Sequence, residues 1–162
     1  MNVHHLSQDD AARFLEFRTQ GLIDDHDAFR VTADDDAAVP VNEWRARIDR
    51  DYVVAAIGQK GEWMGVGGLS RFAGEKLRHK GLIWGMYVTP TARGTGVADE
   101  IMRALIHHAQ GKLHHLQLTV MADNHRAQAF YERHGFTVYA VEPESVLSGD
   151  GFAGEALMRR PL

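Results

Sequence analysis

The fold of this chain is decided by residues 83–98, which read IWGMYVTPTARGTGVA. The apolar first half is typical of a strand, and the loop after Pro90 leads into a helix that begins near Gly96. Gly94 and Gly96 allow a tight turn and the close approach of a ligand to the backbone. Because the first N–H groups of a helix lack intrahelical partners and lie at its positive end, the turn predicts a pyrophosphate site, with Arg93 adding positive charge.

Two other nucleotide sites fit this turn less well. No Gly-Lys-Ser or Gly-Lys-Thr follows at the spacing of a P-loop. The third glycine of the dinucleotide-binding fingerprint is not in its place, and the preceding strands read as hairpins rather than as a βαβ unit. A glycine turn alone is weak evidence, because an ordinary turn has the same composition. The sequence on either side has to decide what the turn binds.

Helices and strands alternate after the turn. A helix is predicted over residues 96–108, because apolar residues recur at four-residue spacing, as on a helix packed against a sheet. These residues are Val97, Ile101, Leu105 and Ala109. A strand over Leu116–Val120, a helix over Asn124–His134 and strands from Phe136 and from about Phe152 follow. This half of the chain predicts a βαβαβ arrangement.

Three strands are predicted before the turn, over Tyr52–Ile57, Glu62–Phe72 and Gly81–Val88, because these runs are rich in Val, Ile, Leu, Trp and Tyr. Gly58 and Gly61 bracket a two-residue hairpin turn. Antiparallel pairing of all three strands is the simplest arrangement.

The amino-terminal segment predicts a strand over Asn2–Leu6, followed by a helix that the Ser7–Asp10 capping box opens. Its rough apolar face comprises Ala12, Leu15, Phe17, Leu22 and Ile23. We expect Gly21 to mark a break within this helix. The acidic stretch Asp24–Pro40 predicts a long surface connection, ordered only in part. Asn42 is expected to cap a second short helix.

Composition narrows the function classes. The 162 residues are 44% hydrophobic and 25% charged, as in one globular domain, and the absence of cysteine excludes disulfide, thiolate-metal and cysteine-nucleophile chemistry. Neither a signal peptide nor a spanning segment is recognisable, so we expect a cytoplasmic protein without a membrane partner. A net charge of −4 argues against nucleic acid and favours a cationic or neutral substrate. The ten histidines include three adjacent pairs, which do not share a face, so no metal site is expected.

Two motifs resemble those of one family. Residues 93–98, RGTGVA, resemble the Q/R-x-x-G-x-G/A coenzyme A loop of the GNAT superfamily of N-acetyltransferases, preceded as in that family by a strand ending in Val-x-Pro. Residues 124–136, NHRAQAFYERHGF, are similar to the family's N-x-x-A-x-x-F-Y-x-x-x-G-F segment. The motifs stand in the family's order and separation, and a looser resemblance extends over nearly the whole chain.

The resemblance implies an α/β GNAT-like fold over residues 1–162 as a single domain, with a central mixed, mostly antiparallel sheet of about seven strands flanked by about four helices. It implies acetyl-CoA as co-substrate and no metal. Backbone N–H groups of the glycine turn would hold the pyrophosphate, and the backbone of the preceding strand would pair with the pantetheine arm. The positions assigned to coenzyme binding are Met86, Tyr87, Val88, Arg93, Gly94, Thr95, Gly96, Val97, Ala98, Asn124, Ala127 and Phe130.

Catalytic roles also come from the resemblance. Tyr131 matches the family tyrosine that protonates the departing thiolate as a general acid, against the alternative of an aromatic packed beside Phe130. Asn124 is a natural helix N-cap as well as a coenzyme ligand.

The general base does not follow from the resemblance. Many relatives carry a glutamate on the strand before the loop, but Ile83–Val88 has no acidic residue. We hypothesise a water relay that ends on Glu43, Glu62 or a member of the Asp24–Asp27 group, each of which also suits a solvated surface.

The expected function is direct acetyl transfer to a primary amine of a small molecule or peptide. A non-catalytic acyl-CoA-binding module and a transferase for a longer acyl group are the alternatives. The acidic loop would attract a cationic amine, or merely face water. Four aromatics could line an acceptor pocket or belong to the core: Phe29, Trp63, Trp84 and Tyr87. A homodimer is common among relatives, but nothing in the sequence decides it.

Overall fold

A seven-stranded mixed sheet, in the order β1-β2-β3-β4-β5-β7-β6, forms the centre of the computed structural model, which describes all 162 residues. The strands are β1 (Asn2–His5), β2 (Tyr52–Ile57), β3 (Trp63–Arg71), β4 (Lys80–Val88), β5 (His115–Met121), β6 (Thr137–Ser148) and β7 (Gly151–Pro161). Only β4 and β5 pair in parallel. The predicted fold class and the antiparallel pairing of the three middle strands are confirmed.

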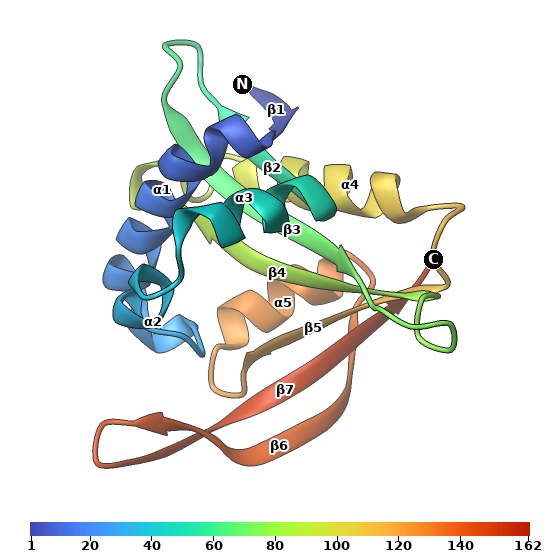
Figure 1. Cartoon of the computed structure of the whole chain (residues 1–162). Helices are drawn as coiled ribbons and strands as arrows, with labels where there is room; N and C mark the ends of the chain where they lie inside the picture. Colours follow the sequence, from blue (N-terminus) through green and yellow to red (C-terminus); the bar gives the residue numbers. More distant parts are fainter.

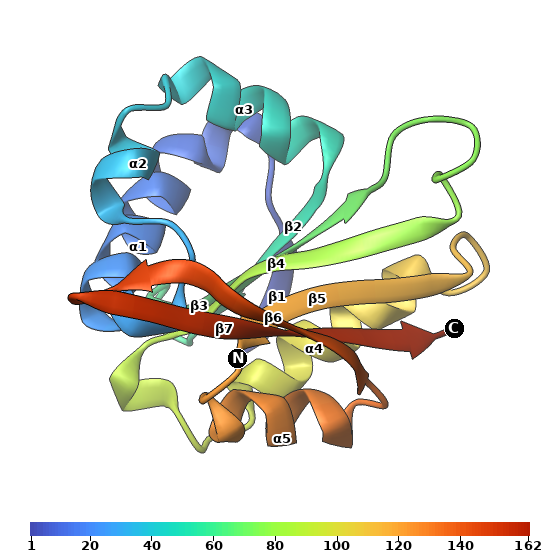
Figure 2. The same ribbon diagram turned by 90° about the horizontal axis from the view of Figure 1, so that it is seen from below.

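Two layers of helices cover the sheet (Figures 1 and 2). One layer consists of α1 (Ala11–Asp24), α2 (Ala33–Ala37) and α3 (Val41–Arg50); the other consists of α4 (Val97–Ala109) and α5 (His125–Arg133). Figure 2 shows the first layer on one side of the sheet and the second on the opposite side. The chain therefore has five α-helices where about four were expected.

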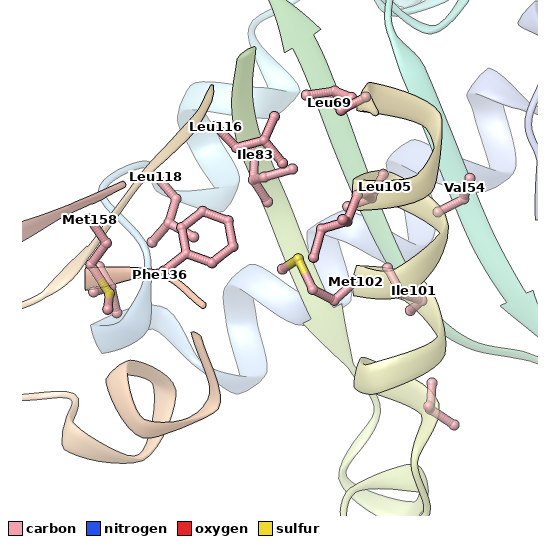
Figure 3. Packing of buried hydrophobic residues seen from close by; sticks show 14 of the residues in the cluster. Val54, Leu69, Ile83, Ile101, Met102, Leu105, Leu116, Leu118, Phe136 and Met158 are labelled. Carbon is pink, nitrogen blue, oxygen red and sulfur yellow. The ribbon is translucent and has the colours of Figure 1, made fainter. Parts of the chain in front are cut away.

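The larger core lies beneath α4, where Ile101, Met102 and Leu105 pack against residues of β2 to β5 (Figure 3). Glycines in β3 let the helix approach closely. A Cβ added at Gly67 would lie 2.8 Å from the Ile101 side chain, a distance that real Cβ atoms do not adopt. The glycines of β3 thus set how closely α4 packs against the sheet, which in turn positions the amino terminus of α4.

β4 and β5 separate along their length. Their pairing covers only three residues of each strand, 80–82 in β4 and 115–117 in β5. Beyond this point β4 is distorted at Gly85, where φ is +65°, and β3 shifts register opposite it. Because a positive φ favours glycine, this residue allows the strand to bend away from its neighbour. An opening is left between the carboxyl-terminal halves of the two strands.

The amino-terminal half corrects three expectations. Gly21 does not break α1, which continues to Asp24; the glycine is needed because a Cβ there would lie 2.7 Å from the Tyr87 ring. The expected long connection contains α2, which a Thr32 capping box opens. Pro40, rather than Asn42, is the N-cap residue of α3.

The apolar face of α1 also differs from the expected one. The helix buries Ala11, Phe14, Arg18, Gly21 and Leu22. Ala12 and Ile23, which were assigned to this face, are exposed. An arginine therefore lies on the buried side of α1, facing the rest of the protein.

The carboxyl-terminal half departs from a simple βαβαβ arrangement. β7 lies between β5 and β6 and is antiparallel to both. Each of these two pairings is long, and β5 forms backbone pairs with β7 over all seven of its residues, from His115 to Met121. The long β6–β7 hairpin extends beyond the helices (Figure 1).

Candidate functional site

A cavity of about 900 Å³ occupies the opening between β4 and β5. Residues 82–88 of β4 and 118–121 of β5 form its walls, and both helix layers contribute. At one end, which we call the loop end, it is lined by the glycine turn before α4 and by α5. At the other, which we call the arginine end, it is lined by Arg18 of α1, Asp36 of α2, Arg47 of α3 and Trp84 of β4. The cavity thus connects the two faces of the sheet.

The loop end presents unpaired backbone donors. None of the amides of residues 94–99 donates a hydrogen bond within the protein, and the first such bond of the turn is donated by Glu100 to the Gly96 carbonyl. Gly94 and Gly96 have φ of +75° and +89°, and nothing lies within 4 Å of a Cβ added at either residue. These donors stand at the amino terminus of a 13-residue helix. The arrangement fits the pyrophosphate of a nucleotide-like cofactor.

Arg93 stabilises this turn through two side-chain contacts. Its Nε donates to the Val88 carbonyl at 3.1 Å, and its Nη2 forms a short ion pair with Asp25. The Thr95 hydroxyl donates to the Ala92 carbonyl at 2.6 Å. Arg93, Gly94, Gly96 and Ala98 line the cavity, whereas Thr95 and Val97 do not, and the Val97 side chain is buried in the core.

The second motif forms the opposite wall of the loop end. Asn124 is the N-cap of α5 and accepts a hydrogen bond from the Ala127 amide at 3.1 Å through Oδ1. The cap leaves the side-chain amide group of Asn124 without a partner in the protein. Asn124, Ala127 and Phe130 line the cavity together with Tyr131.

Tyr131 lies in the cavity wall with its ring packed edge-on against Phe130 and Phe136, at centroid distances of 5.2 and 6.0 Å. Its hydroxyl has no hydrogen-bond partner in the protein. Burial raises the pKa of Tyr131 to about 12, because the phenolate is poorly solvated there. Tyr131 is therefore protonated at neutral pH, and it lines the cavity, where it can donate its proton to an atom of a bound ligand.

The β4 positions Met86, Tyr87 and Val88 also line the cavity. The Tyr87 side chain belongs to the α1 side of the sheet, where its hydroxyl donates to Asp24 at 2.7 Å. Burial, followed by this hydrogen bond, raises the pKa of Tyr87. The hydrogen bond from Tyr87 in turn lowers the pKa of Asp24. Tyr87 thus anchors the end of α1 to β4.

The expected relay carboxylates lie mostly outside the cavity. Glu43 is exposed on α3, and Glu62 accepts a hydrogen bond from the Lys60 amide in the β2–β3 turn. Of the Asp24–Asp27 group, only Asp25 lines the cavity, and it is paired with Arg93.

Glu155, which sequence reasoning missed, is the cavity carboxylate on β7. Its side chain is 3% exposed, and its Oε1 accepts hydrogen bonds from Arg30 at 2.8 Å and from Ser145 at 2.5 Å. Its Oε2 has no hydrogen-bond partner. An acidic residue directly before the apolar run Ala156–Met158 of a strand was the signal that could have identified it.

The arginine end was not foreseen either. Arg18 donates from Nε to Asp36 at 2.5 Å, and Arg47 lies over the Trp84 ring. Of the candidate pocket aromatics, Phe29, Trp84 and Tyr87 line the cavity. Trp63 does not line it, and instead packs against Phe17 and the guanidinium of Arg13.

No group of three or more His, Asp or Glu side chains is placed to hold a metal ion. No helix has both the length and the apolar composition needed to cross a bilayer.

Comparison with known proteins gives one family. The model of the acetyltransferase (GNAT) family matches residues 19–136. Among solved structures, a GNAT-family acetyltransferase from Streptococcus pneumoniae superposes with a TM-score of 0.87 at 20% identity, over 99% of both chains. A putative acetyltransferase from Salmonella typhimurium, solved with its cofactor acetyl-CoA, has a TM-score of 0.82 at 18% identity, over 100% of this chain and 94% of that chain.

A phosphinothricin acetyltransferase from Sinorhizobium meliloti, solved in complex with acetyl-CoA, has a TM-score of 0.83 at 16% identity, over 99% of this chain and 88% of that chain. At such low identities, these structures show the likeness of the fold. Among curated proteins, no sequence matches this chain.

Proposed function

This chain belongs to the acetyltransferase (GNAT) family, with acetyl-CoA as its co-substrate, and we propose that it transfers the acetyl group directly to a primary amine without a covalent enzyme intermediate. The observation that carries the proposal is that a set of unpaired backbone amides and a tyrosine hydroxyl line the same cavity. The unpaired amides of residues 94–99 lie at its loop end, and the Tyr131 hydroxyl lies in its wall.

The loop end is the place for the coenzyme. Backbone donors of the turn would bind the pyrophosphate, supported by the positive end of α4. The pantetheine arm would run between β4 and β5, where the backbone of Met86, Tyr87 and Val88 is open to it. Asn124, Ala127 and Phe130 would contact it from α5. This path directs the thioester toward Tyr131.

The reaction requires that one proton be donated to the departing sulfur and that another be removed from the amine nitrogen. The amine nitrogen attacks the thioester carbonyl carbon, the C–S bond breaks, and Tyr131 donates its proton to the departing thiolate sulfur. The phenolate so formed recovers a proton from water. Because burial raises the pKa of Tyr131 to about 12, the phenol is fully protonated at neutral pH and ready for this role.

The proton lost by the nitrogen goes to Glu155 in this proposal, directly or through one water molecule. The Oε2 atom of Glu155 is free to accept it, while Arg30 and Ser145 hold Oε1 in place. This assignment replaces the earlier candidates Glu43 and Glu62, which lie outside the cavity.

A non-catalytic coenzyme-binding module would not need a general acid. The free Tyr131 hydroxyl in the cavity wall therefore favours the enzyme over this alternative. A transferase for a longer acyl group has no specific observation in its favour.

The test is a panel of primary amines assayed by release of the coenzyme A thiol. We expect thiol release that depends on the amine, and a fall in kcat of about 100-fold or more in Tyr131→Phe, with unchanged acetyl-CoA affinity. Tyr139→Phe is the matched control, because Tyr139 is exposed on β6 and does not line the cavity. If Tyr131→Phe is as active as the wild type, the general-acid assignment is wrong.

A further inference from the structure

Two arginines and two tryptophans are stacked at the arginine end of the cavity. The Arg47 guanidinium carbon lies 3.6 Å from the centroid of the Trp84 ring and 5.4 Å from that of Trp44. The Arg18 guanidinium carbon lies 5.8 and 5.4 Å from the same two rings. A guanidinium whose flat face is covered by an aromatic ring keeps its N–H donors at its edges. These donors are available to a group that enters the cavity.

Most N–H donors of the two arginines have no hydrogen-bond acceptor within the protein. Arg18 uses only Nε, in its bond to Asp36, and its two terminal nitrogens make no hydrogen bond although the side chain is only 10% exposed. Arg47 makes no hydrogen bond, and its Nε lies 3.6 Å from the nearest carboxylate oxygen, on Asp51. Asp51 is itself shared with Arg50 and Ser70. A nine-tenths buried guanidinium with unmatched donors that faces a cavity indicates a missing acceptor.

The balance of charge at this end is positive. Burial, the largest cause, lowers the pKa of Arg47, Asp51 opposes this, and the like charge of Arg18 adds to it. The other cavity carboxylates are already paired, Asp25 with Arg93, Glu155 with Arg30, and Asp99 with His134 and Arg133. An added anion would therefore relieve repulsion between the two arginines, whereas an added cation would increase it.

We infer that the arginine end binds the carboxylate of the acetyl acceptor, so that the acceptor is an amino acid or another primary amine that carries a carboxylate. This inference rests on the proposed function, which requires an amine in the same cavity. A planar carboxylate accepts from the edges of two guanidinium groups, a geometry that an ammonium ion does not match. The overall charge of −4, which favoured a cationic or neutral substrate, does not describe this end of the cavity.

The test compares acceptors that differ only in the acidic group. L-Amino acids, the corresponding amides and the amines without the carboxylate are assayed for acetylation by thiol release and mass spectrometry. We expect kcat/KM to be about 10- to 100-fold higher for the acids, the range that a charge-assisted hydrogen-bonded pair provides. Arg47→Leu should remove this preference by raising KM for the acid far more than KM for its amide, with the affinity for acetyl-CoA unchanged.

Arg45→Leu is the matched control, because Arg45 is exposed on the same helix and does not line the cavity. Arg47→Lys should keep part of the preference, since it retains the charge and loses the planar fork. Acetylation of amides or plain amines as efficiently as of the acids overturns the carboxylate inference alone. If the protein binds coenzyme A but acetylates no amine of any class, the proposed function fails, and the inference that rests on it fails with it.

Discussion

Arg18 on α1 donates from Nε to Asp36 on α2 at 2.5 Å, and both side chains are almost fully buried at the arginine end of the cavity. Their pairing joins α1 to a five-residue helix in which Asp36 is the one buried residue. The segment between α1 and α3, which the sequence indicated as a partly ordered connection, thus becomes part of the cavity wall.

Removal of the Asp36 carboxylate should destabilise the protein. Asp36→Ala leaves the buried Arg18 charge without its partner, and we expect a loss of about 3 kcal/mol in the free energy of unfolding, measured by chemical denaturation. Asp34→Ala on the same helix is the control, because Asp34 is exposed and unpaired. Equal stability of the two variants would show that the pair does not hold α2 in place.

The role of the glycine turn in coenzyme binding can be tested at Gly94, with Gly111, a glycine of similar conformation, as the control. Gly94 and Gly111 have φ of +75° and +73°, and neither has an atom within 4 Å of an added Cβ. Substitution by alanine should cost each variant about 1 kcal/mol through backbone strain. Only Gly94→Ala should weaken coenzyme A binding, measured by calorimetry, because Gly111 lies outside the cavity. Equal coenzyme affinity in both variants would count against the loop end as the pyrophosphate site.

The pH profile of kcat reports on Tyr131. Because burial raises its pKa to about 12, we expect no loss of kcat from its ionisation up to about pH 10. The folded state holds this proton more tightly than the unfolded state, so the corresponding stability is present below about pH 10 and is lost as the pH rises through about 12. A fall in kcat near neutral pH that disappears in Tyr131→Phe would contradict this assignment.

Glu155→Gln tests the proton acceptor. We expect a fall in kcat of about 100-fold with the affinity for acetyl-CoA unchanged, because glutamine keeps the size of the side chain but does not accept the proton. The control is Glu142→Gln, because Glu142 faces Glu155 across the β6–β7 pair but is exposed. A kcat in Glu155→Gln equal to that of the wild type would remove Glu155 as the proton acceptor and leave the coenzyme site unaffected.

Much of the fold could be predicted from the sequence because many turns, helix caps and helices depend on residues that are close together in the chain. The glycine turn and the apolar spacing that begins at Val97 depend on neighbouring residues, and both the turn and α4 are confirmed. The Ser7 capping box is also confirmed, although it opens a short 3₁₀ turn before α1. Likewise Asn124 is the N-cap of α5, as expected.

Features that depend on distant contacts were not predictable in the same way. The position of β7 between β5 and β6 follows from pairing between residues that are far apart in sequence, such as Leu118 and Met158. The arginine end brings together Arg18, Asp36, Arg47 and Trp84 from four separate elements. No local pattern reveals that Arg18 and Arg47 would lie over the same two tryptophan rings. The net charge also gave no indication of the charge inside the cavity.

The most direct test of acetyl transfer is the stoichiometry of a single reaction. Purified protein, acetyl-CoA and the best acceptor of the panel are incubated, and free coenzyme A thiol and N-acetylated product are quantified together. The account predicts one N-acetylated product for each thiol released, with both reduced in parallel by Tyr131→Phe. Thiol release without an acetylated amine, or coenzyme A binding with neither product, would contradict it.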